Sequence, residues 1–260
     1  MPEIKYFDSA GVQIAYIDEP SHPTAAHHHN VPILLIHGFA SNIAMNWTAP
    51  SWVETLRRDG FRVIALDNRG HGQSEKLYDI AQYGAPLMAD DAARLLDHLA
   101  IPRAHVMGYS MGSRISAFLT LKYPDRVARL IFGGLGINMI RGMAGTGPIA
   151  HALEAPCIDD VTNPTARTFR AFAEQTKSDL KALAACIRSS REPLPAEKLA
   201  TIKSPVLVAV GERDVIGGSA EALADVIPGA KAFVIPGREH MKAVGDKAYK
   251  AAVIEFLTSP

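Results

Sequence analysis

The chain has 260 residues, of which 48% are hydrophobic, and 27 basic residues balance 27 acidic residues to a formal net charge of zero. This composition predicts a well-buried globular core in one large domain or two small ones. Nucleic-acid binding is not expected without a basic face, and no apolar stretch approaches the roughly 18 residues of a membrane-spanning helix. The N-terminal residues lack the charge and apolar run of a secretory signal, so we expect a cytoplasmic protein.

The chain begins with a predicted antiparallel hairpin at residues 4–19, with its turn at Ser9-Ala10-Gly11. Continuous apolar runs then predict strands buried on both faces at 31–38, 61–67, 104–110, 127–134, 205–211 and 230–237. Helical patterns lie between or after them at 46–60, 87–100, 111–123, 219–227 and 246–257. This alternation predicts an α/β fold, a doubly wound and mostly parallel sheet with helices on both faces.

The alternation is interrupted between residues 135 and 202, a segment that is more polar and rich in glycine and proline. Its clearest element is a single predicted helix over 165–190. We therefore expect a core domain made of residues 1–134 and 203–260, with 135–202 inserted as a cap or lid over one edge of the sheet. Four apolar residues early in the insertion favour a hydrophobic acyl group or, equally, packing of the cap: Ile137, Met139, Ile140 and Met143.

Ser110 lies in Gly108-Tyr109-Ser110-Met111-Gly112, where a predicted buried strand passes directly into a helix. This is the setting of a nucleophile elbow, in which a strained turn exposes the serine hydroxyl at the carboxyl edge of the sheet. Gly108 and Gly112 would give the strand and helix room to approach closely. The sequence therefore predicts that Ser110 is a nucleophile rather than a turn residue.

A serine nucleophile needs a histidine base and an acid that orients it. His240 follows the last predicted strand at the carboxyl edge, and Asp214 follows the preceding strand at the same edge. The order Ser110, Asp214, His240 is the one expected for a triad built on a strand–turn–helix elbow. Glu212 is a competing acid closer to its strand, and Asp67 is expected to hold the adjoining loop.

The other histidines are less suited to the role of base. His151 lies in the insertion without a supporting pattern. Six others are expected at the opposite edge of the sheet: His22, His27, His28, His29, His98 and His105. His37 and His71 lie in loops at the correct edge but belong to other patterns. His37 is expected to organise its loop, supported by Gly38.

Stabilising an oxyanion requires two N–H donors near the nucleophile. The backbone N–H of Met111 lies at the start of the predicted helix, and Phe39 follows the turn at His37-Gly38. These two groups are the predicted oxyanion hole. Cys157 and Cys186 lack the spacing of a metal site and are expected to be reduced thiols. The histidine run at 27–29 is expected to lie in a solvated loop and not to bind a metal ion.

The chain resembles the α/β-hydrolase fold superfamily in four stretches: "HGF" at 37–39, "DNRGHGQS" at 67–74, "GYSMG" at 108–112, and the late Asp214 and His240. The resemblance implies a Ser110-Asp214-His240 triad, oxyanion donors at Phe39 and Met111, a cap formed by the insertion, and no cofactor. Serine at the elbow is unlike the aspartate of haloalkane dehalogenases and epoxide hydrolases. "HGFA" differs from the "HGGG" of large-sheet lipases.

We expect a serine hydrolase, a carboxylesterase, that cleaves esters of small, largely apolar substrates through an acyl-enzyme. Three other enzyme types remain open: a hydrolase of carbon–carbon bonds in ring-cleavage products, a cofactor-free haloperoxidase or perhydrolase, and a lactonase. A carbon–carbon hydrolase would need a cation for its acidic substrate, for which Arg141 and Arg188 are candidates. A non-catalytic binding protein of the same fold is the alternative outside enzymes, and the intact triad argues against it.

Overall fold

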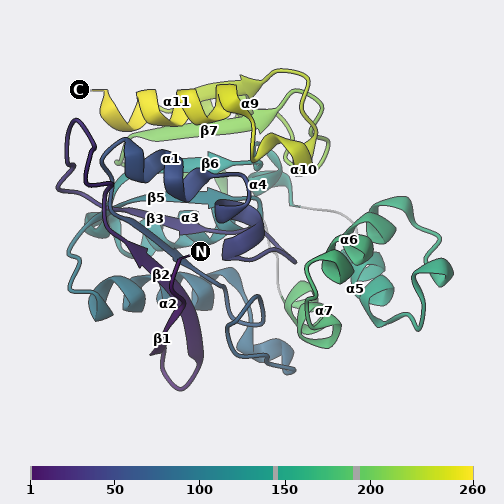
Figure 1. Ribbon diagram of the computed structural model, residues 1–260. Helices are drawn as coiled ribbons and strands as arrows, with labels where there is room; N and C mark the ends of the chain where they lie inside the picture. Colours follow the sequence, from purple (N-terminus) through teal and green to yellow (C-terminus); the bar gives the residue numbers. More distant parts are fainter. Residues whose placement is uncertain (1, 143–145, 190–193, 260) are drawn as a thin grey trace.

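The structure is a computed structural model that describes residues 2–142, 146–189 and 194–259. In this part of the chain, eight strands form one sheet in the order β1-β2-β4-β3-β5-β6-β7-β8 (Figure 1). The strands are β1 Lys5–Asp8, β2 Gln13–Glu19, β3 Ile33–Ile36, β4 Val63–Leu66, β5 Ala104–Tyr109, β6 Val127–Gly133, β7 Val206–Gly211 and β8 Lys231–Ile235. β2 is antiparallel to β1 and β4, and the other neighbouring pairs are parallel. The predicted fold class is confirmed.

The N-terminal hairpin turns where the sequence predicts. The N–H of Ser9 donates to the carbonyl of Val12 at 2.8 Å, and the N–H of Val12 donates back at 3.3 Å. Ala10 and Gly11 between them have φ values of 53° and 86°. Two successive left-handed residues are the geometry of a tight hairpin turn whose twist matches the strands.

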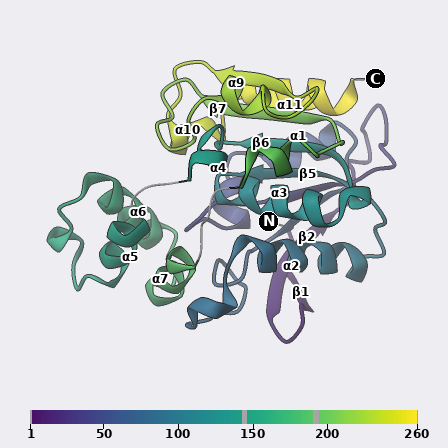
Figure 2. The same ribbon diagram turned by 180° about the vertical axis from the view of Figure 1, so that it is seen from behind.

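Helices cover both faces of the sheet, because alternate residues of each central strand point to opposite sides. In β3, Ile33 and Leu35 join one apolar cluster, and Leu34 and Ile36 join the other. The first cluster is covered by α1 and α11, and the second by α2, α3 and α9 (Figures 1 and 2). These helices are α1 Trp52–Arg58, α2 Ala85–His98, α3 Met111–Lys122, α9 Ala220–Ala224 and α11 Lys247–Thr258.

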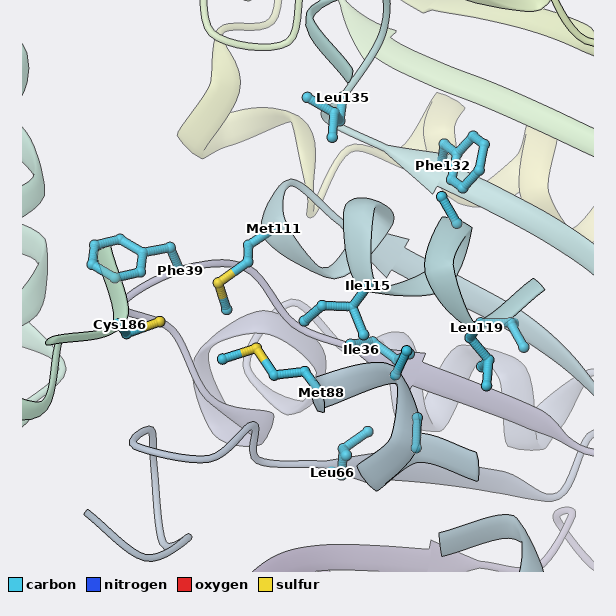
Figure 3. Close-up of a cluster of buried hydrophobic side chains, with 14 of the residues drawn as sticks. Ile36, Phe39, Leu66, Met88, Met111, Ile115, Leu119, Phe132, Leu135 and Cys186 are labelled. Atoms are coloured by element: carbon cyan, nitrogen blue, oxygen red, sulfur yellow. The ribbon is translucent and has the colours of Figure 1, made fainter. Parts of the chain in front are cut away.

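Figure 3 shows part of the second cluster, in which Met88 of α2 and Ile115 of α3 gather with Ile36 and Met111. All four side chains are nearly or fully buried. This packing fixes α3 on the sheet and, with it, the residue at which α3 begins. None of the helices in the described residues is long and apolar enough to cross a membrane.

The helical pattern at 46–60 forms two pieces rather than one helix. A π-helical turn at Ala44–Thr48 is followed by Pro50 and by Ser51, whose φ is 63°, before α1 starts. Proline has no N–H to donate within a helix. Together with the left-handed residue after it, Pro50 separates the two pieces.

The described part of the predicted insertion contains α4 Asn138–Arg141, α5 Thr146–Glu154, α6 Pro164–Gln175, α7 Leu180–Arg188 and α8 Ala196–Leu199. In both views α5, α6 and α7 stand apart from the layers that sandwich the sheet (Figures 1 and 2). The start of the segment is bound to the core instead: the N–H of Gly136 donates to Gly217 at 2.9 Å, and the amide of Asn138 donates to Ile216 at 2.9 Å.

The expectation of one helix over 165–190 is wrong. The chain leaves α6 at Thr176, takes a left-handed conformation at Lys177 with φ of 53°, and begins α7 after Asp179. The Asp179 carboxylate accepts the N–H of Ala182 at 2.9 Å, which is a helix N-cap. This cap stabilises a new helix start in the middle of the predicted helix.

Among the contacts that join α6, α7 and the turn between them to the core are two hydrogen bonds and one ring contact. The Thr176 hydroxyl donates to the carbonyl of Ala40 at 3.0 Å. The Tyr78 hydroxyl donates to Asp179 at 2.9 Å. The rings of Phe169 in α6 and Phe39 lie edge to face with centroids 6.0 Å apart. Two of these contacts involve residues beside the predicted oxyanion hole.

Candidate active site

Ser110 occupies a strained turn between β5 and α3, with φ of 55° and ψ of −113°. Such a conformation is uncommon for a residue with a side chain and costs about 1–3 kcal/mol. The surrounding structure holds it in place: the N–H of Ser110 donates to Gly133 at 2.7 Å, and its carbonyl accepts the N–H of Ser113 at 3.0 Å. The hydroxyl is thereby presented at the carboxyl edge of the sheet.

The two glycines around Ser110 are required by close backbone contacts. A Cβ atom at Gly108 would lie 2.2 Å from the carbonyl oxygen of Gly112. A Cβ atom at Gly112 would lie 1.9 Å from the carbonyl oxygen of Ile36 in β3. Any side chain at either position would push α3 away from the sheet and displace Ser110.

The structure brings Ser110, His240 and Asp214 into one hydrogen-bonded chain. His240 begins the short helix α10 His240–Ala243, and its Nε2 lies 3.0 Å from the Ser110 hydroxyl. Its Nδ1 lies 2.7 Å from Asp214 Oδ2. Because a carboxylate only accepts hydrogen bonds, Nδ1 carries the proton and Nε2 offers its lone pair to the serine hydroxyl. This arrangement can remove the hydroxyl proton during an attack by Ser110.

Asp214 is itself fixed by backbone donors. Its Oδ1 accepts the N–H groups of Ile216 at 2.9 Å and Gly217 at 2.8 Å, while Oδ2 is left to His240. Only 7% of Asp214 and 6% of His240 are exposed, so solvent hardly screens the pair. The carboxylate therefore has one orientation, and that orientation sets the tautomer of His240.

Tyr109 contacts His240 through a hydrogen bond that was not predicted from the sequence. Its hydroxyl donates to the backbone carbonyl of His240 at 2.5 Å, and the two rings lie 5.6 Å apart. Burial raises the pKa of the Tyr109 hydroxyl well above its usual range, so this group remains a donor. No sequence signal indicates this bond, because 131 positions separate its two ends.

The two competing acids hold loops instead. Glu212 accepts the N–H of Gly237 at 2.6 Å in the turn after β8. Asp67 accepts the N–H of Ile43 at 2.7 Å through one oxygen and that of Gln73 at 2.7 Å through the other. The structure thus brings Asp214 to the histidine, and Asp67 ties its loop as expected.

His37 is buried beside the site and is held neutral. The N–H of Asn68 donates to its Nε2 at 2.9 Å, so the proton lies on Nδ1, 2.7 Å from the carbonyl of Gly38. Burial lowers the pKa of His37, with nearby Asp67 acting in the opposite direction. A neutral imidazole bonded at both nitrogens fixes the loop that leads to Phe39, as the sequence predicts.

The remaining histidines do not approach Ser110 through any hydrogen bond of the described structure. His29 stacks on Phe61, and His105 lies at the amino end of β5, opposite the end that carries Ser110. His151 is exposed on α5. In the described ranges, no group of three or more His, Cys, Asp or Glu side chains is arranged to hold a metal ion.

The predicted oxyanion residues both lie close to Ser110. Met111 is the first residue of α3, and a Cβ atom at Gly38 would lie 3.4 Å from the Ser110 Cβ, so the backbone before Phe39 lies against the serine. Asn46 holds this backbone by accepting the Gly38 N–H at 3.2 Å. The side chains of Phe39 and Met111 belong to the apolar cluster drawn in Figure 3.

Two cavities meet at Ser110 in the described part of the chain, and both are also lined by Phe39 and Phe169. The small cavity, of about 30 Å³, is lined further by Met111, Arg114, Leu135, Asn138 and Ile216. The large cavity, of about 130 Å³, reaches His240 and is walled mainly by Met45, Asn46, Phe172, Met241 and Val244. Their linings are mostly apolar, which suits a substrate with little charge.

Comparison with known proteins supports the fold. A family model described as the alpha/beta hydrolase fold matches residues 31–140. A hydrolase structure from Pseudomonas aeruginosa PA01 is 27% identical with a TM-score of 0.73, covering 99% of both chains. The structure of a thermophilic esterase from Thermogutta terrifontis is 25% identical with a TM-score of 0.73, covering 98% of both chains. This chain has the α/β-hydrolase fold.

Among curated relatives of this α/β-hydrolase chain is a 2-hydroxymuconate semialdehyde hydrolase from Pseudomonas sp. (strain CF600). The two are 34% identical over 125 residues, which cover 48% of this chain and 41% of the relative. The chain spans only 35% to 58% of the lengths of four curated relatives that it matches.

The α/β-hydrolase site contains a cation that the sequence analysis missed. Arg114, one turn into α3, lines the small cavity and donates to the carbonyl of Met139 at 3.3 Å. Its position four residues after Ser110, on the same face of the helix, is the sequence feature that could have indicated this placement. Neither sequence candidate contributes to that lining: Arg188 pairs with Glu154 through two bonds of 2.6 and 2.8 Å, and Arg141 ends α4 with its side chain exposed.

For the apolar residues early in the insertion, the structure favours packing over contact with an acyl group, the two alternatives that the sequence left equally open. Met139 is fully buried in the core cluster and Ile140 packs against that cluster, whereas Ile137 packs close to Gly218. Met143 lies outside the described residues. The early part of the insertion contributes Leu135 and Asn138 to the small cavity instead.

Proposed function

We propose that this chain is a serine hydrolase that cleaves carboxylic ester bonds of small, largely apolar substrates through an acyl-enzyme intermediate. The observation that carries the proposal is the chain of hydrogen bonds from Ser110 through His240 to Asp214, with spacings of 3.0 and 2.7 Å, at the junction of two apolar cavities. Nucleophile, base and orienting acid within hydrogen-bond reach are the signature of an activated serine.

In the first half of the proposed reaction, His240 Nε2 takes the hydroxyl proton as Ser110 Oγ bonds to the ester carbonyl carbon. The backbone N–H groups of Phe39 and Met111 stabilise the negative charge on the former carbonyl oxygen. The carboxylate of Asp214 stabilises the imidazolium that forms. When the ester C–O bond breaks, His240 returns its proton to the leaving alkoxide.

In the second half, a water molecule takes the place of the alcohol. His240 removes a proton from this water as the water oxygen attacks the acyl carbon. The bond from that carbon to Ser110 Oγ then breaks, and His240 reprotonates the serine. Acid and regenerated enzyme are the products, and neither half needs a cofactor.

We also propose that residues 135–202 act as a cap on a core made of 1–134 and 203–260. The contacts of Phe169 with Phe39 and of Thr176 with Ala40 support this, because α6 and the residue after it touch the loop that carries one proposed oxyanion donor. A cap in this position limits the access of water and the size of substrates.

Hydrolysis of a carbon–carbon bond is a second candidate. It is favoured by the likeness to a protein named as a 2-hydroxymuconate semialdehyde hydrolase and by the Arg114 guanidinium in the small cavity lining, a type of group that binds carboxylates. A vinylogous diketone acid would be cleaved by such an enzyme, whereas simple uncharged esters would be cleaved by an esterase.

The test is hydrolysis of p-nitrophenyl esters from acetate to decanoate by the wild-type protein and by Ser110→Ala. The proposal expects turnover with at least one ester and a loss of about 10⁴-fold or more in Ser110→Ala, since removing a triad serine removes covalent catalysis. A folded protein without activity on any ester, but active on a vinylogous diketone acid, would reject esterase function in favour of the second candidate.

A further inference from the structure

The two cavities at Ser110 differ in size and in their relation to the base. The small cavity of about 30 Å³ has Ser110 and Met111 in its lining but not His240. The large cavity of about 130 Å³ has both Ser110 and His240 in its lining. A substrate bound to Ser110 thus has one end near the base and the other end away from it.

The chemistry of ester cleavage assigns the two ends. The leaving oxygen must lie beside His240 Nε2, because that nitrogen delivers the proton on which departure of the alcohol depends. The group attached to this oxygen therefore extends into the large cavity. The acyl group, which remains bonded to Ser110 Oγ, extends into the small cavity past Met111.

From this assignment we propose that the substrates are esters of a very short acid with a bulky apolar alcohol. The inference rests on the proposed esterase function. A space of about 30 Å³ holds one or two water-sized groups, which corresponds to the methyl or ethyl group of an acetyl or propionyl ester. An apolar cavity of about 150 Å³ binds benzene, and the large cavity, at about 130 Å³, is close to that size, so it suits the ring or branched group of a bulky alcohol.

The walls of the small cavity are held by the core, which prevents it from widening. Leu135 is only 8% exposed and belongs to the main apolar cluster. The segment that carries it is bonded to another residue of the cavity wall, since the amide of Asn138 donates to the carbonyl of Ile216 at 2.9 Å. Enlarging this cavity would require breaking core contacts.

The large cavity has less constrained walls. Phe172 on α6 and Met241 on α10 are only half-buried, and neither has a polar side chain that would fix its position. Methionine in particular adapts its shape to different partners. We therefore expect tolerance of different alcohols and strict selection of the acid.

Two isomeric esters test the proposal with the same atoms in opposite orientations. Benzyl acetate places the ring on the alcohol, and methyl phenylacetate places it on the acid. The proposal expects kcat/KM to be at least about tenfold higher for benzyl acetate, since pocket mismatch of this kind costs 1 kcal/mol or more. Equal rates, or a preference for methyl phenylacetate, would overturn it while leaving esterase function intact.

Cavity variants identify the residues responsible. Leu135→Ala should raise the relative rate on methyl phenylacetate at least about threefold, and Leu135→Val, a milder change to the core, should shift the ratio in the same direction. Met45→Ala, in the large cavity, is the matched control and should not favour methyl phenylacetate. A shift caused by Met45→Ala and not by either Leu135 variant would reverse the assignment. Absence of Ser110-dependent hydrolysis of every ester, p-nitrophenyl acetate included, would reject both the proposal and the esterase function.

Discussion

Replacing Asp214 with asparagine tests how the site sets the tautomer of its base. Asp214 Oδ1 accepts two backbone N–H groups at 2.9 and 2.8 Å, and Oδ2 accepts the Nδ1–H of His240 at 2.7 Å. In Asp214→Asn the two backbone donors still need an acceptor, so the amide oxygen takes the Oδ1 position and the NH₂ group faces the histidine. An NH₂ group cannot accept a hydrogen bond. His240 must then carry its proton on Nε2, where Ser110 needs a lone pair.

The expected loss is large because the base is disabled while the geometry stays intact. In a serine protease triad the corresponding change lowers kcat by about 10⁴-fold, or about 5.5 kcal/mol of transition-state stabilisation. In this chain the two backbone N–H donors keep the amide oxygen of the Asp214→Asn side chain on their side, so the NH₂ group remains directed at His240. We expect a loss in kcat/KM of that order for Asp214→Asn on p-nitrophenyl acetate.

Steady-state hydrolysis of p-nitrophenyl acetate near pH 8 measures the effect, and circular dichroism checks that the variant is folded. Glu212→Gln is the matched control, since Glu212 lies in the same loop but accepts the N–H of Gly237. Its kcat/KM should remain within about threefold of the wild-type value, the range of surface substitutions. A kcat/KM of Asp214→Asn within about tenfold of wild type, or a loss in Glu212→Gln as large as in Asp214→Asn, would show that Asp214 does not set the tautomer of His240.

Three further changes test the surroundings of the site. Thr176→Val should lower kcat about three- to tenfold, since it removes a hydroxyl whose proton is shared between the carbonyls of Ala40, beside Phe39, and Ala173, a bond worth about 1 kcal/mol. Thr176→Ser should recover the rate, and equal rates for both variants would contradict this role. Arg170→Met should lower the free energy of unfolding in urea by about 2 kcal/mol, because the buried guanidinium donates to backbone carbonyls at the end of α5; an unchanged midpoint would exclude this contribution. Burial lowers the pKa of His105 from 6.5 to about 4, so the fold favours its neutral form. Stability should therefore fall as pH drops from about 6.5 to about 4, by at most about 3 kcal/mol from this residue. Guanidinium unfolding at pH 7 and pH 4.5 should show a smaller pH effect in His105→Leu, and an equal or larger effect would contradict the assignment.

The features that the sequence predicted well are those determined by local pattern. Strands buried on both faces must be almost continuously apolar, and the run at 33–36 forms β3 with every residue fully buried. The turn at Ser110 is also local, because the crowding that requires Gly108 and Gly112 arises within a few residues and at the neighbouring strand. These patterns were enough to anticipate the sheet, the elbow and the edge at which Asp214 and His240 lie.

Features that depend on the meeting of distant segments, or on the backbone conformation of one residue, were not predicted. Lys177 carries no side-chain signal for its left-handed conformation, although Asp179 before an apolar run is a helix-start pattern that was available. The bond from Tyr109 to the His240 carbonyl and the position of Arg114 in the small cavity depend on packing between separate elements. The sizes of the two cavities depend on the same packing, so the sequence alone does not predict which substrates fit them.

The central claim, that Ser110 is a nucleophile activated by His240, is tested most directly by covalent labelling. A fluorophosphonate loses fluoride as a serine oxygen bonds to its phosphorus, and peptide mass spectrometry locates the adduct. We expect rapid labelling of Ser110 in the wild-type protein and little labelling of Ser110 in folded His240→Ala. Labelling at another serine, such as neighbouring Ser113, or labelling of Ser110 at the same rate without His240, would contradict it.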